Sequence, residues 1–204
     1  MSRFVFLVFL MAVNCTAYSQ KMYVWAPKKF SPAPRIGFLQ GDTIFLSIFD
    51  ARMITKKNKI ESTSEEVIEN VHNLIAQSYP SATIVYDNNL YYKKSSKTAI
   101  TIKIAISAYH AGFGSDITMG IGSRGGSFSA MVFPKGKWNA MTAYNVRITD
   151  NREGRNIEQS KDVSSVDSAS NMMGYQSAKK CLTNSYVSAT QQLFMFIDSV
   201  LMHE

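Results

Sequence analysis

The chain has 204 residues, of which 46% are apolar, and a formal net charge of +7 at neutral pH. That length predicts one ordinary domain, whose core is large enough to be stable without disulfides or a structural metal. The apolar content is that of a globular protein. The positive charge is spread along the chain and favours anionic surfaces such as phospholipid headgroups or acidic glycans. Export, argued next, excludes nucleic acid as the natural partner.

The first twenty residues have the layout of a secretory signal peptide. Arg3 provides a basic start, residues 4–13 form a run of ten apolar side chains, and Ala17 and Ser19 are small residues at the −3 and −1 positions of a cleavage site. Ten apolar residues are too few to span a bilayer as a helix, which needs roughly 20. We therefore predict removal of residues 1–19.

Cys15 leaves a second route of maturation open. Bacterial lipoproteins are cut just before a lipid-modified cysteine that follows a small residue, and Asn14 fits that position poorly. Either route predicts an exported protein of the periplasm or the outer-membrane periphery, or an extracellular one. Cys181 is then the remaining unmodified cysteine, which predicts a core without an internal disulfide and a buried thiol in a helix.

The amino-terminal half contains an arm followed by a strand, a helix and a second strand. Residues 20–41 contain three prolines without a helix or strand period and predict an extended arm that docks on its own domain or on a partner. Residues 42–50 are nearly all apolar and predict a central strand covered on both faces. A capping box at residues 63–66 begins a helix that ends before Pro80, and residues 83–86 predict a short strand.

The carboxyl-terminal half contains strands and then one long helix. Residues 98–109 alternate isoleucine with smaller or polar side chains and predict a strand with one apolar face. Residues 127–133 and 138–149 predict two more strands, and residues 154–168 are polar and predict a loop. From about residue 168 the chain is expected to turn helical, with an apolar stripe that reaches the carboxyl-terminal end, and Gly174 marks either the true start of this helix or a kink.

This order predicts an α+β fold with a mostly antiparallel sheet of about five strands and two helices packed on one face. The predicted organisation is a signal peptide over residues 1–19, the proline-containing arm over residues 20–41 and a single domain over residues 42–204.

The sequence contains no motif that specifies a reaction. Residues 120–125 read GIGSRG, which matches the dinucleotide spacing GxGxxG, but a strand pattern follows where that motif needs a helix. His72, His110 and His203 have no partner at metal-ligand spacing, and no GxSxG elbow occurs. We therefore expect no catalytic residues, no metal and no cofactor.

Asp50 and Arg52 form the best polar pair, because alternate strand positions share a face and predict an ion pair that caps the sheet. A buried strand that ends in Asp-x-Arg, an amphipathic helix, isoleucine-rich strands and a long Ser/Ala-punctuated helix resemble YajG-type envelope lipoproteins and, more loosely, the amino-terminal domain of TolB. The resemblance covers residues 42–201. The chain departs from these lipoproteins in that it has no good lipidation site. It implies a non-catalytic accessory or assembly module that faces the periplasm.

We predict a non-enzymatic envelope domain that binds another envelope component, either a protein or an anionic surface, with peripheral membrane contact as one form of this binding. The candidate contact residues lie in the arm and in the glycine-rich segment 112–126, namely Trp25, Phe30, Arg35, Gly120, Gly122 and Arg124. Two alternatives stay open. One is a small secreted hydrolase or carbohydrate-active enzyme with a site assembled from scattered residues, such as His110 beside Asp50. The other is a lipid- or glycan-binding domain.

The predicted maturation is tested by intact-mass measurement of the exported protein. The expected chain begins at Gln20, with or without cyclisation of that residue, because the small-x-small site precedes it. A mature form that retains residues 4–13, or one that carries a lipid on Cys15, contradicts this prediction.

Overall fold

The structure is a computed structural model, which describes residues 22–23, 30–52, 59–89, 99–114, 136–152 and 155–202. Its strands are β1 (Met22–Tyr23), β2 (Thr43–Asp50), β3 (Lys59–Ile60), β4 (Thr83–Tyr86), β5 (Ile100–Phe113), β6 (Lys137–Asp150) and β7 (Ile157–Ser170). Its helices are α2 (Ser64–Ser78), a 3-10 turn η3 (Asn171–Met173) and α3 (Tyr175–Leu201).

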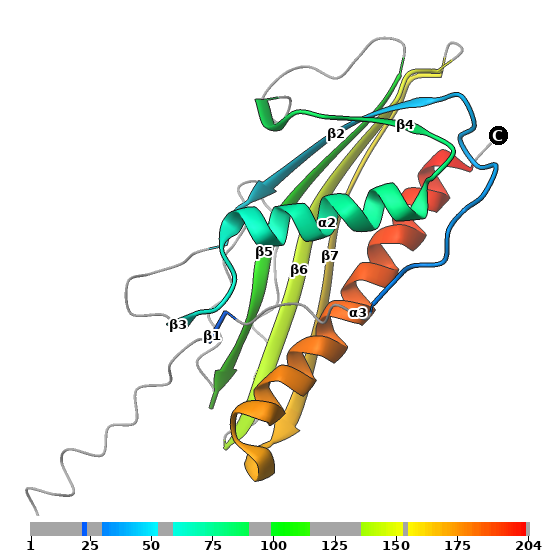
Figure 1. Ribbon diagram of the computed structural model, residues 1–204. Helices are drawn as coiled ribbons and strands as arrows, with labels where there is room; N and C mark the ends of the chain where they lie inside the picture. Colours follow the sequence, from blue (N-terminus) through cyan, green and yellow to red (C-terminus); the bar gives the residue numbers. More distant parts are fainter. Residues whose placement is uncertain are drawn as a thin grey trace, which may run out of the picture.

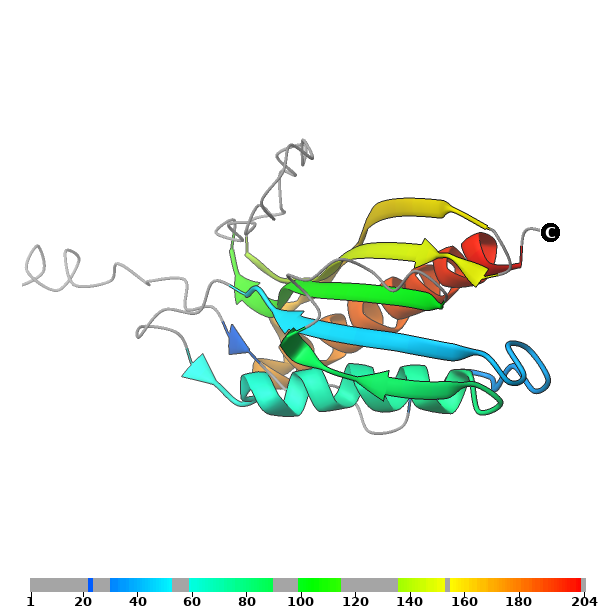
Figure 2. The ribbon, with the colours of Figure 1, turned by 90° about the horizontal axis from the view of Figure 1, so that it is seen from above.

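The described strands form one mixed sheet whose main path is β4-β2-β5-β6-β7 (Figures 1 and 2). The two longest pairings, β5 with β6 and β6 with β7, are antiparallel. β2 lies parallel to both β4 and β5, because α2 carries the chain from β2 back to the start of β4. The short strand β1 pairs with β5 at Ala111, beyond the end of β2, and β3 pairs with β1. The predicted α+β class with a mostly antiparallel sheet is confirmed.

Both helices cover one face of this sheet, and they lie in front of it in Figure 1. That face is built from the alternating positions of β5, which pair with apolar residues of β2 and β6: Ile44 with Ile100, Leu46 with Ile102, and Ile104 with Val146. The capping box predicted at Thr63 is present and begins α2. The buried residues of α2 and α3 join the sheet residues in the main apolar core, and Ala108, Met141 and Ala143 form a second, smaller cluster.

The opposite face of β2 is less covered than we predicted. Ile44, Leu46 and Ile48 are buried, but Phe49 is 40% exposed. Gly174 marks the true start of the long helix, one of the two roles predicted for it. The helix begins at Tyr175 instead of near residue 168, because Gly174 has a φ of +53° and reverses the chain before the helix starts. None of the helices that the structure describes is both long enough and apolar enough to cross a membrane.

The predicted loop over residues 154–168 is wrong, because most of that segment belongs to β7. The strand pairs with β6 over its full length, from Ile157 opposite Asp150 to Ser170 opposite Lys137. It escaped prediction because Val163 is the one side chain of β7 that is fully buried, so no apolar alternation marks the strand. The predicted strand over residues 127–133 lies outside the described residues.

Ile102 and Ile104 are predicted to be core residues, and both are fully buried in the middle of β5. Replacing either with alanine is expected to lower the free energy of unfolding by about 2–5 kcal/mol, through lost burial and the cavity left behind. Denaturant melts measure this loss, with Ile36→Ala as the matched control, since Ile36 is 83% exposed. A loss below about 1 kcal/mol at Ile102 or Ile104 contradicts the assignment of this face to the core.

Candidate functional site

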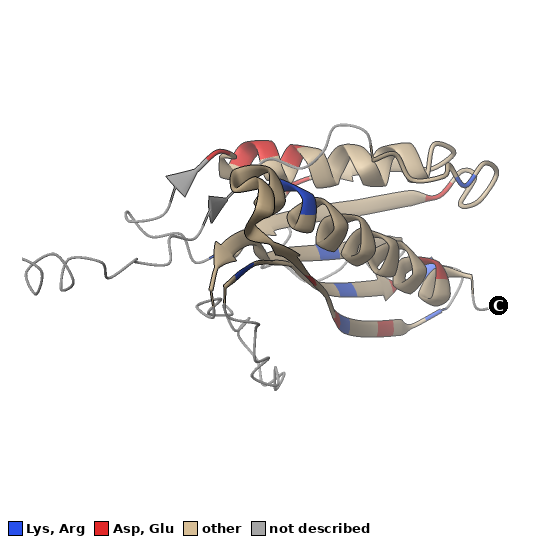
Figure 3. Cartoon of the chain, turned by 90° about the horizontal axis from the view of Figure 1, so that it is seen from below, with Lys and Arg blue, Asp and Glu red and all other residues tan. Residues whose placement is uncertain are grey.

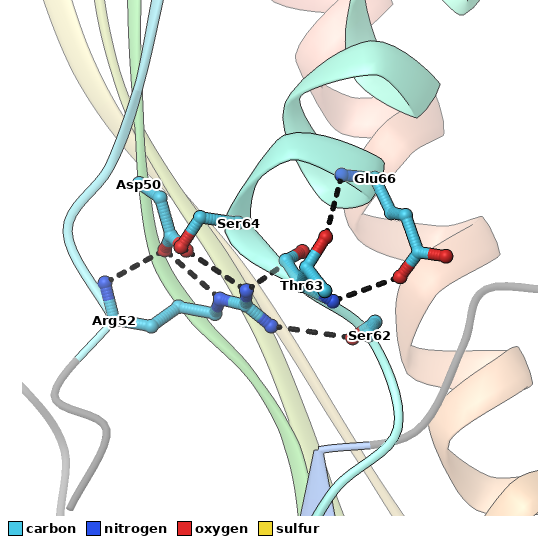
Figure 4. A network of polar contacts seen from close by, with 6 residues as sticks. All are labelled: Asp50, Arg52, Ser62, Thr63, Ser64 and Glu66. Atoms are coloured by element: carbon cyan, nitrogen blue, oxygen red, sulfur yellow. Dashed lines mark hydrogen bonds and ion pairs between the residues drawn. The ribbon is translucent and has the colours of Figure 1, made fainter.

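The predicted pair of Asp50 and Arg52 is confirmed at the end of β2 (Figure 4). Arg52 Nε donates to Asp50 Oδ1 at 2.9 Å and Nη2 donates to Oδ2 at 2.8 Å, so the guanidinium and the carboxylate meet through two parallel bonds. The backbone N–H of Arg52 donates to the same carboxylate at 3.0 Å. Both side chains are nearly inaccessible to solvent, which makes this a buried pair rather than a surface one.

The same pair fixes the start of α2 (Figure 4). The Ser64 hydroxyl donates to Asp50 Oδ2 at 2.5 Å, and Arg52 reaches the carbonyl oxygen of Thr63 at 3.4 Å. Burial raises the pKa of Asp50, but the hydrogen bonds from Arg52 and Ser64 outweigh burial and hold that pKa below its ordinary value. The carboxylate is therefore charged and saturated with donors. It joins β2 to α2 and is poorly placed to act as a general base.

A second Asp-x-Arg arrangement occurs at the end of β6. Arg152 Nε and Nη2 donate to Asp150 at 2.9 and 2.8 Å, and its backbone N–H donates to the same carboxylate at 3.1 Å. Arg152 Nη1 also binds Asp42, just before β2. Because β2 runs parallel to β5 and β6 runs antiparallel, this pair closes the opposite end of the sheet from Asp50. Sequence reasoning missed it, although the same Asp-x-Arg spacing after a strand was there to find.

A cleft of about 380 Å³ lies beside this second pair. Its lining residues are Phe38, Gln40, Asp42, Arg152, Arg155, Leu201 and Met202. Two arginines face two carboxylates here, because Arg155 lies 3.4 Å from Asp150 and Arg152 binds both Asp150 and Asp42. Both arginines of the cleft are therefore held in ion pairs with carboxylates of the domain.

The part of the arm that the structure describes docks on its own domain. The Arg35 guanidinium binds Asp198 of α3, with Nε 2.7 Å from Oδ1 and Nη2 2.6 Å from Oδ2. It also lies over the neighbouring rings of Tyr79 and Phe194, at 5.2 and 4.9 Å from their centroids. Phe30 packs edge-on against Tyr186 at 6.0 Å. These contacts hold residues 30–35 along α3.

The other predicted contact residues are not placed. Trp25, Gly120, Gly122 and Arg124 lie outside the described residues. Partner binding by these four, and by Phe30 and Arg35 in addition to their internal contacts, stays a prediction.

The thiol and the described histidines have structural surroundings. Cys181 is buried and free, and burial together with the charge of Asp167 raises the pKa of Cys181 to about 11, so the thiol stays protonated. His72 packs against Tyr86 with a centroid distance of 5.0 Å, and His110 is buried within β5. Within the described residues, no group of three or more histidine, cysteine or acidic side chains could hold a metal ion.

The outer edge of β7 is a different kind of candidate site, made of backbone groups. Among the described strands, β7 pairs with β6 alone. Two hydrogen bonds show which backbone groups of β6 face β5: the Gly114 N–H donates to the Lys137 carbonyl oxygen, and the Asn151 N–H donates to the Ala99 carbonyl oxygen. Both β6-side residues are odd-numbered, so the odd-numbered residues of β6 direct their backbone groups toward β5. Even-numbered residues of β6 therefore point toward β7, where their partners are odd-numbered. The even-numbered residues of β7 consequently direct N–H and C=O groups away from the sheet.

Seven residues form this outer edge: Glu158, Ser160, Asp162, Ser164, Val166, Ser168 and Ser170. The pairing of β7 with β6 is continuous, without a bulge, and β7 contains no proline. Bulges and prolines are common devices that protect an edge strand against further pairing. A strand of 14 residues is also about 45 Å long, far longer than most edge strands. The edge is therefore a continuous row of hydrogen-bonding groups with small or polar side chains.

Comparisons with known proteins place the chain near several solved structures. No protein-family model matches, and no curated protein matches. A hypothetical protein of Chlamydia trachomatis is 10% identical with a TM-score of 0.47, covering 79% of this chain and 98% of that one. A Xanthomonas campestris protein of family DUF330 is 9% identical with a TM-score of 0.46, covering 84% and 92%. A lipoprotein of Neisseria meningitidis is 10% identical with a TM-score of 0.29, covering 76% and 98%. At these values no function transfers from the neighbours.

The buried Asp50–Arg52 pair predicts a loss of stability in acid. The folded pKa values of Asp50 and Asp150 lie below 3.8, so their contribution is present above pH ~4 and is lost as the pH falls through the folded values. At neutral pH, Asp50→Asn is expected to lower the free energy of unfolding by about 3–5 kcal/mol, because Arg52 is left buried without its counter-charge.

Denaturant melts between pH 7 and pH 3 measure both effects. Glu158→Gln is the control, because Glu158 forms an exposed pair with Arg147 at 3.7 Å and its loss is expected to cost under about 1 kcal/mol. An Asp50→Asn variant that melts like the unmodified protein and keeps the full acid transition contradicts the structural role of this network.

Proposed function

We propose that the protein is an exported, non-enzymatic module of the cell envelope that binds a partner protein by strand addition at the outer edge of β7. The open edge of β7 is the observation that carries the proposal. Strand addition takes its affinity from main-chain hydrogen bonds and its specificity from side chains at alternate positions. An edge of this length, without bulge or proline and paired with no described strand but β6, offers both along one side of the sheet.

The side chains of the edge define the kind of segment that fits. The outward-directed positions in the first half of the strand carry two carboxylates, Glu158 and Asp162, whereas those in the second half carry the smaller side chains of Ser164, Val166 and Ser168. Asp162 accepts from Asn145 at 2.6 Å and Glu158 is held near Arg147, so both carboxylates stay on the surface of the sheet. An extended segment with basic residues opposite the first half and apolar residues opposite the second half matches this pattern.

The use of charged groups elsewhere supports a binding role over a catalytic one. The hydrolase alternative places His110 beside Asp50, but Asp50 is occupied by Arg52 and Ser64. The other buried carboxylate at a strand end, Asp150, is occupied by Arg152 in the same way. Export is supported by the signal-peptide pattern of residues 1–19, and the resemblance to YajG-type and TolB-related envelope proteins supports an accessory role.

Site-specific photo-crosslinking in intact cells tests the proposal. A photoreactive residue at Ser160 or Ser168 is expected to give an adduct with a distinct envelope protein, whereas one at Glu69 on α2 is expected to give none. Ser164→Pro removes an outward N–H while sparing the pairing with β6, so it is expected to abolish the adduct. Ser164→Thr keeps that N–H and is expected to retain it.

Two outcomes contradict the proposal. One is an adduct that survives Ser164→Pro in a protein whose thermal melt shows it is folded. The other is an adduct that consists of two copies of this chain, which would make the edge a self-association surface instead of a partner site.

A further inference from the structure

The end of the molecule where β7 passes into α3 carries exposed apolar side chains. The chain reverses there through η3, at the lower end of the sheet in Figure 1. Met172 is 89% exposed and Met173 is 69% exposed. The positive φ of Gly174 reverses the chain here, and the high exposure of both methionines shows that they project outward from a convex turn.

Aromatic side chains stand directly behind this turn. The Trp138 indole Nε1 donates to Asn171 Oδ1 at 2.8 Å. This bond connects the start of β6 to the first residue of η3. Phe113 packs edge-on against Trp138 with a centroid distance of 5.5 Å. Both rings are only partly buried. Tyr175, in the first turn of α3, is partly buried as well.

Lysines surround these apolar groups. Lys137 and Lys180 are exposed, and neither forms an ion pair with another described residue. Lys179 lies 4.9 Å from the centroid of Tyr175 and 3.8 Å from Glu61, which offsets its charge. Figure 3 shows the basic residues on the first turns of α3 and the acidic ones at the start of α2. Among the described residues of the turn, Lys137 and Lys180 are therefore the positive charges that no ion pair offsets.

We propose that this tip, made of Trp138, Met172 and Met173 with Lys137 and Lys180, docks on the surface of a bilayer that contains anionic phospholipids. Exposed apolar side chains enter the headgroup region, tryptophan favours the membrane interface, and lysines reach the lipid phosphates. A convex turn enters a deformable bilayer without a matching cavity, whereas a protein partner would need a pocket shaped to receive it. This geometry favours lipid as the occupant.

The tip adjoins one end of the proposed protein-binding edge, because Ser170 of that edge pairs with Lys137 of the tip. Most of the edge runs along the side of the sheet, away from the tip at its end (Figure 1). The two proposals rest on different groups, backbone groups in β7 and side chains in the tip, so either can fail without the other.

Vesicle co-sedimentation with the purified mature protein tests the docking. Vesicles with about a third phosphatidylglycerol are expected to bind the protein, and pure phosphatidylcholine vesicles are expected to bind it far less. Neutralising Lys137 and Lys180 with glutamine is expected to weaken binding about thirty-fold, since each lysine near an anionic surface contributes roughly a fivefold change. Met172→Ser with Met173→Ser is expected to weaken binding at least about tenfold, through lost apolar insertion.

Met195→Ser is the matched control, because Met195 is 71% exposed on α3 and lies outside the tip. It is expected to bind vesicles like the unmodified protein, and circular dichroism checks that every variant is folded. Three outcomes overturn the proposal: no dependence on anionic lipid, no effect of the tip substitutions, or an equal effect of Met195→Ser. Tip substitutions that release the protein from cell envelopes while bare vesicles fail to bind it would assign the tip to a protein partner and overturn the proposal as well.

Discussion

The apolar face of the sheet, which α2 and α3 cover, is the constraint on which the rest of the structure depends. β5 stands at its centre, and its isoleucines pair in register with the apolar residues of β2 on one side and β6 on the other. Because side chains alternate along a strand, a slip of one residue would expose this whole apolar face to water. The burial of α2 and α3 against it fixes the register, and it also determines which faces and edges stay open.

The two Asp-x-Arg pairs act where that constraint ends. Where a strand ends, its backbone N–H and C=O groups lose their partners in the sheet, and the chain has to change direction. At Asp50 and at Asp150 the arginine two residues later folds back onto the carboxylate through the same set of bonds. Each pair then ties a distant segment, Ser64 at one end of the sheet and Asp42 at the other. These arginines and carboxylates therefore stabilise the fold by connecting strand ends to other segments. Their sequence pattern alone would also be compatible with a polar active site.

Prediction from sequence succeeded where apolar periodicity or capping chemistry was strong. The isoleucine alternation of β5 and the capping box at Thr63 each have a local physical signature, and both were recognised. β7 was missed because its stability comes from backbone pairing with β6, while its side chains are serine, aspartate and glutamate, which also typify loops. The parallel placement of β2 between β4 and β5 could not be predicted either, since strand order depends on contacts between residues far apart in the chain.

The same polar composition that hid β7 explains how so long an edge can be tolerated in a folded protein. An apolar edge of this length would promote aggregation, whereas serines and carboxylates disfavour pairing with unrelated strands. Whether a strand pairs with this edge then depends on the sequence of that strand. The tip follows the opposite rule, because its exposed methionines are few and lie on a turn with no free row of backbone groups. If the tip rests on a bilayer, the strands rise from it and the outer edge of β7 faces sideways, into the space where other envelope proteins are found.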